Sequence, residues 1–340
     1  MQSRIQGTRH AIKFISGFVL AALKVRSSNL SKIAVAFQTS VEYLSTYRQI
    51  QRFLGNLKTV KIDYLGLLKM SGKLQIAIDR TEWKFGKVWV NILTVSVVYR
   101  RVAIPLIWQT VNHKGNAKAL DHLQIIKRMI AEIGKERIAE IYGDREFASR
   151  ELFSFLLKER IDFRIRLKTS YLVGGMSFKQ RWRNLPERVK LRGKVKVEVF
   201  GLKLYVSCVK LKKGGKTEYL IVASGEPSKD ALAEYKVRWA IETMFGCLKS
   251  RGFEMEETHL TETRKISKLL MLLALALCLA ILTGEIKTAI TVKMKLKNNG
   301  RYAKSLFRIG LDALQNILFN IKLPDKLKTF NNLIDLLSCA

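Results

Sequence analysis

One short stretch of the sequence, YKVRWAIETMFGCLK, sets an aromatic hydroxyl, a carboxylate and several cations among large apolar residues. An α-helix advances about 100° per residue, so if Tyr235 defines 0°, Arg238 lies at about 300° and Glu242 at about 340°. Lys249 lies at about 320° by the same rule. The four polar side chains then share a stripe roughly 60° wide. Such a stripe fits phosphate groups beside a carboxylate, and it is equally typical of a solvated helix face with charge pairs.

Two aspartates elsewhere in the chain follow apolar segments of strand length. Asp79 ends the run in IAIDR, and Asp144 ends the run in EIYGDREF. A single Asp in such a place is commonly a turn residue, but the open edge of a mixed sheet is also where α/β proteins build their sites. Three converging carboxylates repel one another, and Mg²⁺ offsets that repulsion because it prefers oxygen ligands. The sequence therefore predicts a metal site formed by Asp79, Asp144 and Glu242.

The chemistry that suits these residues is attack on a phosphodiester. Two divalent ions about 4 Å apart activate the attacking oxygen and stabilise the leaving one. We therefore expect Mg²⁺ as cofactor, with two ions and with Mn²⁺ as the substitute. In this interpretation Arg238 and Lys249 hold flanking phosphates and Tyr235 donates to another. Neither cation is expected to build the fold, so replacing either one should leave the melting temperature nearly unchanged.

The net charge indicates a polyanionic partner. The 340 residues include 61 Lys plus Arg against 28 Asp plus Glu, which gives a formal charge of +33, and the basic residues are spread along the whole chain. Nucleic acid is the first candidate partner and an anionic membrane surface the second. Hydrophobic residues make up 48% of the chain, so global disorder is excluded.

The apolar segments and the cysteines bear on the cellular compartment. The uncharged run LLMLLALALCLAILT is about 15 residues long, short of the roughly 20 that cross a bilayer, and predicts a buried core helix. A membrane-associated basic protein is the alternative interpretation of this run. The apolar stretch near the start is interrupted by His10 and Lys13, which argues against a secretion signal. The four Cys lack the spacing of a zinc site or a disulfide framework, which fits a reducing cytoplasm.

Residues 9–56 predict helices. The stretch SNLSKIAVAFQTSVEYLSTYRQIQRFLGN shows helical periodicity that breaks near residues 38–39 and restarts after Ser40. Two short helices with a tight joint indicate either a helix-turn-helix or an ordinary αα-hairpin. Arg48 and Arg52 lie one turn apart on the second helix, and the high net charge favours DNA as what they contact.

The middle of the chain predicts a mixed sheet. Three strand-like runs (LQIAID, VWVNILTVSVVY and VAIPLIWQTV) precede a helix, a strand at RIAEIYGD, another helix and a strand at DFRIRL. This β-β-β-α-β-α-β order describes a mixed sheet with helices packed on it. Residues 174–220 have short alternating runs and Gly-rich turns, which predict a β-rich insertion. A helix is expected from about Ser228, and the chain to Ala340 is expected to be mostly helical.

The three spacings between the four residues of the helix stripe match a known signature, Y-x2-R-x3-E-x6-K. In this respect the chain resembles the DDE transposases of bacterial cut-and-paste insertion sequences. The segments AIDRT and YGDREF resemble the two aspartate motifs of that family. The strand order resembles its ribonuclease-H-like core, and the β insertion lies where this group carries one.

The resemblance implies an α/β fold with a ribonuclease-H-like mixed-sheet catalytic core, a β-rich insertion and helical regions at both ends. It assigns residues 1–70 to DNA-end binding, 71–168 and 228–260 to the catalytic core, 169–227 to the insertion and 261–340 to a C-terminal helical region. The four histidines stay outside the predicted site, although His113 could face DNA.

The implied activity is metal-dependent cleavage at insertion-sequence ends and strand transfer into target DNA. The implied assembly is a homodimer on paired DNA ends, in the bacterial cytoplasm at the nucleoid. Trp182 is the counterpart of a Trp that stacks on a flipped base, and it is equally a candidate core residue. A non-catalytic repressor of transposition on the same fold and a metal-dependent nuclease are the alternative functions.

Overall fold

The computed structural model describes residues 4–37, 39–57, 60–111, 115, 117–290, 295–296, 298 and 302–338. The chain divides into two compact units. The first unit comprises residues 1–71, 83–90 and 244–340, and the second comprises residues 72–82 and 91–243. These units follow spatial compactness, and the functional boundaries given above stay a prediction.

Helices from both ends of the chain form most of the first unit. The N-terminal helices are α1 (Arg9–Val25), α2 (Leu30–Ala36) and α3 (Tyr43–Asn56). The side chains of Thr8 and Asn29 accept hydrogen bonds from the first turns of α1 and α2, which fixes where these helices begin. The predicted break between two helices near residues 38–39 is confirmed. The remaining small elements of this region are β1 (Ile5–Gln6), β2 (Lys61–Ile62) and α4 (Tyr64–Leu67).

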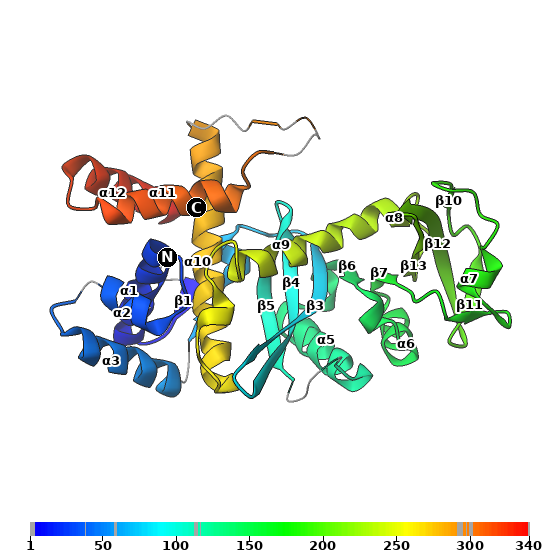
Figure 1. Ribbon diagram of the computed structural model, residues 1–340, viewed down its shortest axis with the longest axis horizontal. Helices are drawn as coiled ribbons and strands as arrows, with labels where there is room; N and C mark the ends of the chain where they lie inside the picture. The colour runs from blue at the N-terminus through cyan, green and yellow to red at the C-terminus, as the bar shows by residue number, and fades with distance from the viewer. Residues whose placement is uncertain are drawn as a thin grey trace. The chain divides into compact units, whose positions relative to one another are not determined.

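The apolar run predicted as a core helix lies in α10 (Thr263–Ile290). This is the one helix among the described residues that is long and apolar enough to cross a membrane, and 72% of its most apolar stretch is buried. It packs against α1, α3 and α11 (Leu306–Phe319), as Figure 1 shows. A Cβ at Gly310 would lie 1.7 Å from the Ala280 carbonyl oxygen, so glycine is required where α11 meets α10. The chain ends in α12 (Pro324–Ser338).

A nine-stranded mixed sheet organises the second unit. Its strand order is β10-β12-β13-β7-β6-β3-β4-β5, with β11 paired to β12. β3 pairs in parallel with β6, and β6 pairs in parallel with β7, whereas β4 and β5 are antiparallel. The core strands are β3 (Leu74–Phe85), β4 (Val88–Tyr99), β5 (Val102–Thr110), β6 (Ile138–Gly143) and β7 (Asp162–Arg166).

The predicted β-β-β-α-β-α-β order is confirmed. α5 (Ala119–Ile133) packs against β5, and α6 (Arg150–Glu159) packs against β7 (Figure 1). Gly86 has a φ of 57°, a left-handed conformation that suits glycine in the turn between β3 and β4.

The β-rich insertion extends the core sheet. Its hairpin strand β13 (Lys216–Ser224) pairs with β7 through Val222 and Ala223, so the insertion and the core share one ladder. The partner strand in the hairpin is β12 (Leu202–Lys213). The other elements of the insertion are β8 (Leu172–Val173), β9 (Met176–Ser177), α7 (Phe178–Arg181), β10 (Lys190–Leu191) and β11 (Lys196–Val199).

The helical segment after the insertion is not one uninterrupted α-helix, and in this respect the prediction is wrong. It consists of α8 (Ala231–Glu234), a 3₁₀ stretch over Tyr235–Arg238 and α9 (Trp239–Leu248). A 3₁₀ helix has three residues per turn, so Tyr235 and Arg238 lie almost directly above one another. Mid-helix 3₁₀ turns often mark functional positions. Lys249 lies beyond the last residue of α9.

Candidate active site

Two of the predicted carboxylates lie at matching positions along neighbouring strands. The parallel pairing of β3 with β6 ends at Ile78 and Gly143. Asp79 and Asp144 come directly after this pair, so both lie at the same edge of the parallel strands, where sites in α/β proteins form. β3 itself continues to Phe85, so the prediction that its strand ends at Asp79 is wrong, and only the parallel pairing ends there.

The helical segment supplies the third carboxylate and joins it to the other two. The guanidinium of Arg238, a side chain that is only 8% exposed, donates to Asp79 Oδ2 at 3.1 Å and makes a short contact with Glu242 Oε1. The hydroxyl of Tyr235 donates to Asp144 Oδ1 at 3.4 Å. The structure therefore brings five of the predicted site residues together in the second unit.

The charges in this cluster shift the ionisation of Asp79. Burial raises the pKa of Asp79 to about 6, and the nearby Arg238 together with the Arg80 amide offsets only part of that effect. The charges of Asp144 and Glu242 raise the pKa further. At neutral pH, an additional cation would stabilise the ionised form of a carboxyl group whose pKa is raised in this way.

Comparison with known proteins places this geometry in a family. The family model described as the transposase DDE domain matches residues 70–279, which contain all three carboxylates. The chain belongs to the transposase DDE domain family. It is a DNA transposase, an enzyme of DNA cleavage and strand transfer.

One solved structure supports the fold of the DDE transposase. The cryo-EM structure of piggyBac transposase in a synaptic complex with hairpin DNA matches 98% of this chain and 76% of that chain, at 11% identity and a TM-score of 0.50. This likeness shows the fold alone and confirms the ribonuclease-H-like core. Endonuclease V from Bacillus subtilis and NurA nuclease from Sulfolobus solfataricus match 65% and 70% of this chain and 90% and 95% of their own, at identities of 10% and 11% and TM-scores of only 0.26 and 0.29. Similarities this low carry no argument, and the comparison with curated proteins gives no match.

The donor set fits the divalent metal that DDE transposase domains generally require. Asp79, Asp144 and Glu242 offer only carboxylate oxygens, the ligands that Mg²⁺ and Mn²⁺ prefer. Among the described residues, no three His, Cys, Asp or Glu lie close enough to enclose a metal ion. The guanidinium of Arg238 lies between two of the carboxylates and supplies the cationic charge there.

A second cluster of hydrogen bonds, centred on Arg80, holds Asp79. The backbone amide of Arg80 donates to Asp79 Oδ1 at 2.8 Å, and the Arg80 guanidinium donates to Glu146 and Glu82. Burial opposes ionisation of Glu146, but the nearby His122, with its Nε2 3.9 Å from Glu146 Oε1, and hydrogen bonds from the Ala117 amide and Arg80 outweigh it and lower the pKa of Glu146. In the transposase, hydrogen bonds therefore hold both the backbone amide and the guanidinium of Arg80, and this keeps Asp79 in place.

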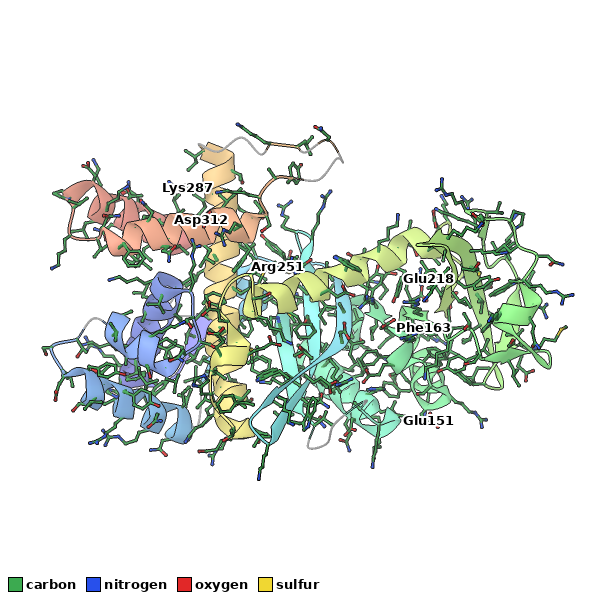
Figure 2. The ribbon with its side chains drawn as sticks, in the orientation of Figure 1. Glu151, Phe163, Glu218, Arg251, Lys287 and Asp312 are labelled. Atoms are coloured by element: carbon green, nitrogen blue, oxygen red, sulfur yellow. The ribbon has the colours of Figure 1, made fainter. Side chains whose placement is uncertain are left out.

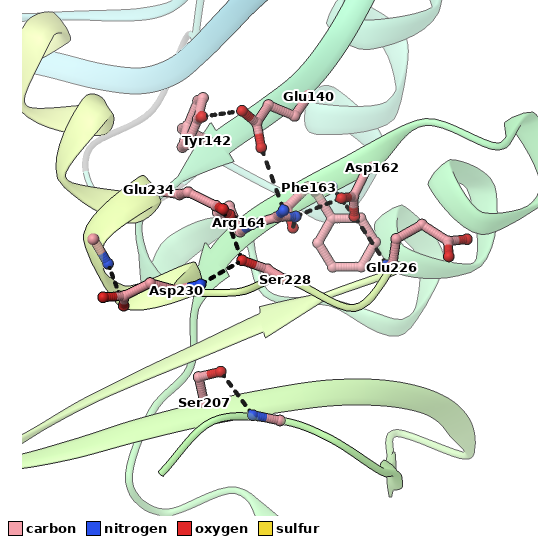
Figure 3. A network of polar contacts seen from close by, with 12 residues as sticks. Glu140, Tyr142, Asp162, Phe163, Arg164, Ser207, Glu226, Ser228, Asp230 and Glu234 are labelled. Atoms are coloured by element: carbon pink, nitrogen blue, oxygen red, sulfur yellow. Dashed lines mark hydrogen bonds and ion pairs between the residues drawn. The ribbon is translucent and has the colours of Figure 1, made fainter. Parts of the chain in front are cut away.

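A buried arginine anchors the start of the helical segment (Figure 3). Arg164 on β7 is 5% exposed and donates to Asp162 Oδ2 and Glu234 Oε2, each at 2.6 Å, while its Nη2 lies 3.6 Å from Glu140 Oε2. Glu234 immediately precedes Tyr235. The Arg164 cluster, defined as Arg164, Asp162, Glu140 and Glu234, therefore ties β6 and β7 to the segment that carries the site.

The remaining predicted site residues lie apart from this cluster. Lys249 belongs to the first unit, where it pairs with Glu256 at 2.6 Å and lies over the ring of Trp83. Arg48 and Arg52 are exposed on α3. The half-buried Trp182 stacks on Phe178 with 4.9 Å between ring centroids, and His113 lies outside the described residues.

The pairing of Arg238 changes one expectation. The sequence predicted that replacing this residue would leave the melting temperature nearly unchanged, but a buried cation between two carboxylates contributes to folding stability. The same expectation for Lys249 stays a prediction, since its carboxylate partner is 46% exposed.

Sequence reasoning missed two arginines next to the site. Arg166 Nη1 lies 4.0 Å from Asp144 Oδ1, and Arg164 forms the anchor just described. Both lie in the strand-like run DFRIRL, where alternation places them on one face of the sheet. Two cations on one face of a strand with apolar neighbours are a signal that could have identified them.

Proposed function

We propose that Asp79, Asp144 and Glu242 jointly hold divalent metal, two Mg²⁺ ions with Mn²⁺ as the substitute. The reaction is cleavage at the ends of an insertion sequence and strand transfer into target DNA. The observation that carries the proposal is the convergence of three carboxylates, from β3, from the end of β6 and from α9, around the guanidinium of Arg238 and the hydroxyl of Tyr235.

Each side chain of the cluster has a separate task. Bound divalent ions would activate the attacking oxygen and stabilise the leaving oxygen of the phosphodiester. Tyr235 orients Asp144 through its hydroxyl, and Arg80 orients Asp79 through its backbone amide. Arg238 neutralises Asp79 and Glu242, and its planar guanidinium also suits bidentate pairing with a phosphate of the DNA.

DNA contacts outside the metal site complete the proposal. Arg48 and Arg52 are both exposed and one turn apart on α3, which suits docking of the N-terminal helices on the DNA ends. Lys249 provides a point charge for a phosphate, and Trp182 offers a ring for base stacking. The four functional segments are residues 1–70 for end binding, 71–168 with 228–260 for catalysis, 169–227 for the insertion and 261–340 for the C-terminal helices.

The assembly and compartment follow from the same function. The enzyme acts as a homodimer on paired inverted-repeat ends, in the bacterial cytoplasm at the nucleoid. A formal charge of +33 supports extensive contact with DNA, and the piggyBac complex that shares the fold contains hairpin DNA.

The test is cleavage of DNA that carries the element's inverted repeat. Asp144→Asn should lower Mg²⁺-dependent cleavage by more than about a hundredfold, because even outer-shell partners of metal ligands are worth 10–100-fold. Its affinity for the same DNA in chelator should stay within a factor of about two, because no DNA contact is assigned to Asp144. Glu151→Gln, an exposed carboxylate on α6, is the matched control and should cleave at the parent rate. Near-normal cleavage by Asp144→Asn would remove Asp144 from the metal site.

A further inference from the structure

A short acidic segment of this basic chain lies beside a lysine that is proposed to contact DNA. Glu254, Glu256 and Glu257 fall within four consecutive residues, which we call the acidic turn. The turn closely follows α9, at a bend where Figure 2 labels Arg251. Carboxylates this close to Lys249 would repel a phosphate held there, so the acidic turn opposes the binding of DNA at this position.

The chain folds back on Lys249 to form the acidic turn, and both lie in the first unit. The amide of Glu254 donates to the Lys249 carbonyl at 2.9 Å. Glu254 has a φ of 51°, a left-handed conformation that is uncommon for residues other than glycine. Met255 is only 2% exposed and anchors the turn in the core of the unit. The backbone therefore brings the next residue, Glu256, within reach of the Lys249 side chain.

The ammonium of Lys249 has two partners of different kinds. It lies 2.6 Å from Glu256 Oε1 and 5.6 Å from the centre of the Trp83 ring. Trp83 is 6% exposed, so its ring is a fixed part of the surroundings. The side chain of Glu256 is 46% exposed and can turn into water without disturbing the core. Trp83 is therefore a constant partner of Lys249, whereas Glu256 is an exchangeable one.

The acidic turn is held in place without the help of Glu256. Lys32 Nζ on α2 lies 3.3 Å and 3.9 Å from the other two carboxylates of the turn. The Ser28 hydroxyl and the Asn29 side-chain amide donate to two backbone carbonyls of the turn, at 3.0 and 3.4 Å. These contacts fix the backbone of the turn to the start of α2. Only the side chain of Glu256 has to move for Lys249 to be released.

A phosphate of DNA and the carboxylate of Glu256 present the same kind of acceptor to Lys249. Both offer anionic oxygens that accept charge-assisted hydrogen bonds. The ammonium of a lysine is a compact point charge with rotatable donors, so it has no geometric preference for one over the other. Ion pairs with an exposed partner contribute little to stability, so a polyanion such as DNA can displace this carboxylate.

We infer that Glu256 is an internal substitute for a DNA phosphate. It pairs with Lys249 in the DNA-free enzyme and leaves Lys249 when DNA binds. The contact is autoinhibitory, because it must break before the phosphate can take its place. The inference rests on the proposed function, since it takes Lys249 to bind a phosphate of the DNA.

The test measures how tightly the full-length protein binds a fluorescent duplex that carries the element's inverted repeat, in chelator and at low salt. Glu256→Gln removes the competing charge and should tighten binding about threefold, as expected for a pair of this exposure. Glu257→Gln is the matched control, because it removes one charge from the same turn but its partner is Lys32. The control should change the affinity by less than about 1.5-fold. In a Lys249→Ala background, Glu256→Gln should give no gain, because no cation is left to release.

Three outcomes would overturn the inference. They are no gain from Glu256→Gln, an equal gain from Glu257→Gln, and a gain from Glu256→Gln that persists in the Lys249→Ala background. An equal gain from the control would indicate that the turn only repels DNA. Both substituted glutamates are exposed, so melting temperatures close to the parent's serve as the check on folding.

Lys249→Ala by itself separates the inference from the proposed function. If this variant binds the duplex as tightly as the parent, Lys249 makes no phosphate contact, and the proposed role and the inference are both wrong. If Lys249→Ala weakens binding but Glu256→Gln does not tighten it, the phosphate contact stands and only the internal substitute is wrong.

Discussion

Two arginines in the second unit occupy similar surroundings. Arg238 and Arg164 are 8% and 5% exposed, and each contacts at least two carboxylates. Each also lies at the helical segment that carries Glu242, the first within the segment and the second at its start. Side-chain composition alone does not separate them.

The two clusters differ in what else their carboxylates accept. In the Arg164 cluster, Asp162 Oδ1 also accepts from the backbone amides of Phe163, Gly225 and Glu226, at 2.8 to 3.1 Å. Glu234 accepts from Ser228 at 2.8 Å, and Glu140 accepts from Tyr142 (Figure 3). Glu140 also accepts from Gln75 at 3.2 Å. Most of these acceptor positions are therefore filled from within the protein.

Asp144, one of the three carboxylates near Arg238, has weaker partners. Asp144 accepts from Tyr235 only at 3.4 Å, and Arg166 lies as far as 4.0 Å from it. Burial keeps the pKa of Asp79 near 6 despite Arg238. Carboxylates whose hydrogen bonds are satisfied within the protein form a permanent structural link. A cluster in which one carboxylate has only long contacts and another has a raised pKa is suited to exchanging its cation. The predictions that follow test this difference.

The largest effect is expected from Arg164→Gln. This change leaves Asp162, Glu140 and Glu234 without their shared cation, and breaking a buried ion pair from one side costs about 3–5 kcal/mol. Urea unfolding should show that loss, and added Mn²⁺ should not restore it. Arg128→Gln breaks an exposed pair, with side chains 58% and 49% exposed, and should cost less than about 1 kcal/mol. If Arg164→Gln lowered the free energy of unfolding no more than this control, the Arg164 cluster would not be a permanent structural link.

An intermediate effect is expected from Arg238→Gln. In chelator the free energy of unfolding should fall by about 2 kcal/mol, less than for Arg164→Gln, because Glu242 is 35% exposed and regains water. Mn²⁺ should then bind more tightly than to the parent without DNA, because the competing charge is gone, and should restore stability. Titration calorimetry with Mn²⁺ measures this directly. Mn²⁺ affinity equal to the parent's would contradict the idea that Arg238 occupies the place of a cation.

Much of the fold and of the candidate site could be predicted from the sequence. Apolar runs predicted β3 to β7 in order, and the residues after two of those runs are the aspartates that the parallel pairing places side by side. Fixed spacing predicted Tyr235, Arg238 and Glu242, which the structure brings to those aspartates. These features depend on local periodicity, which a sequence records.

Other features depend on long-range pairing that periodicity does not record. The helical segment was predicted from a constant 100° per residue, but a 3₁₀ turn over Tyr235–Arg238 directs Arg238 onto Asp79, and the stripe ends before Lys249. Arg164 was passed over because its partners lie up to 70 residues away. Predicted DNA contacts at Arg48, Arg52 and Trp182 stay predictions.

The smallest effect, and the finest test of the comparison, comes from removing one hydroxyl from each cluster. Ser228→Ala deletes a 2.8 Å hydrogen bond to Glu234 and also the acceptor for the Asp230 amide, so it should cost about 1 kcal/mol. Tyr235→Phe deletes only the 3.4 Å bond to Asp144, at the far limit of hydrogen bonding, and should cost about 0.5 kcal/mol or less. Cleavage should respond in the opposite order, because Tyr235 orients a proposed metal ligand and Ser228 does not. Ser16→Ala, an exposed hydroxyl within α1, sets the baseline near zero. The opposite outcome is that Tyr235→Phe destabilises the protein more than Ser228→Ala and leaves cleavage unchanged. The carboxylates around Arg238 would then be the permanent structural link, and the distinction between the two clusters would be reversed.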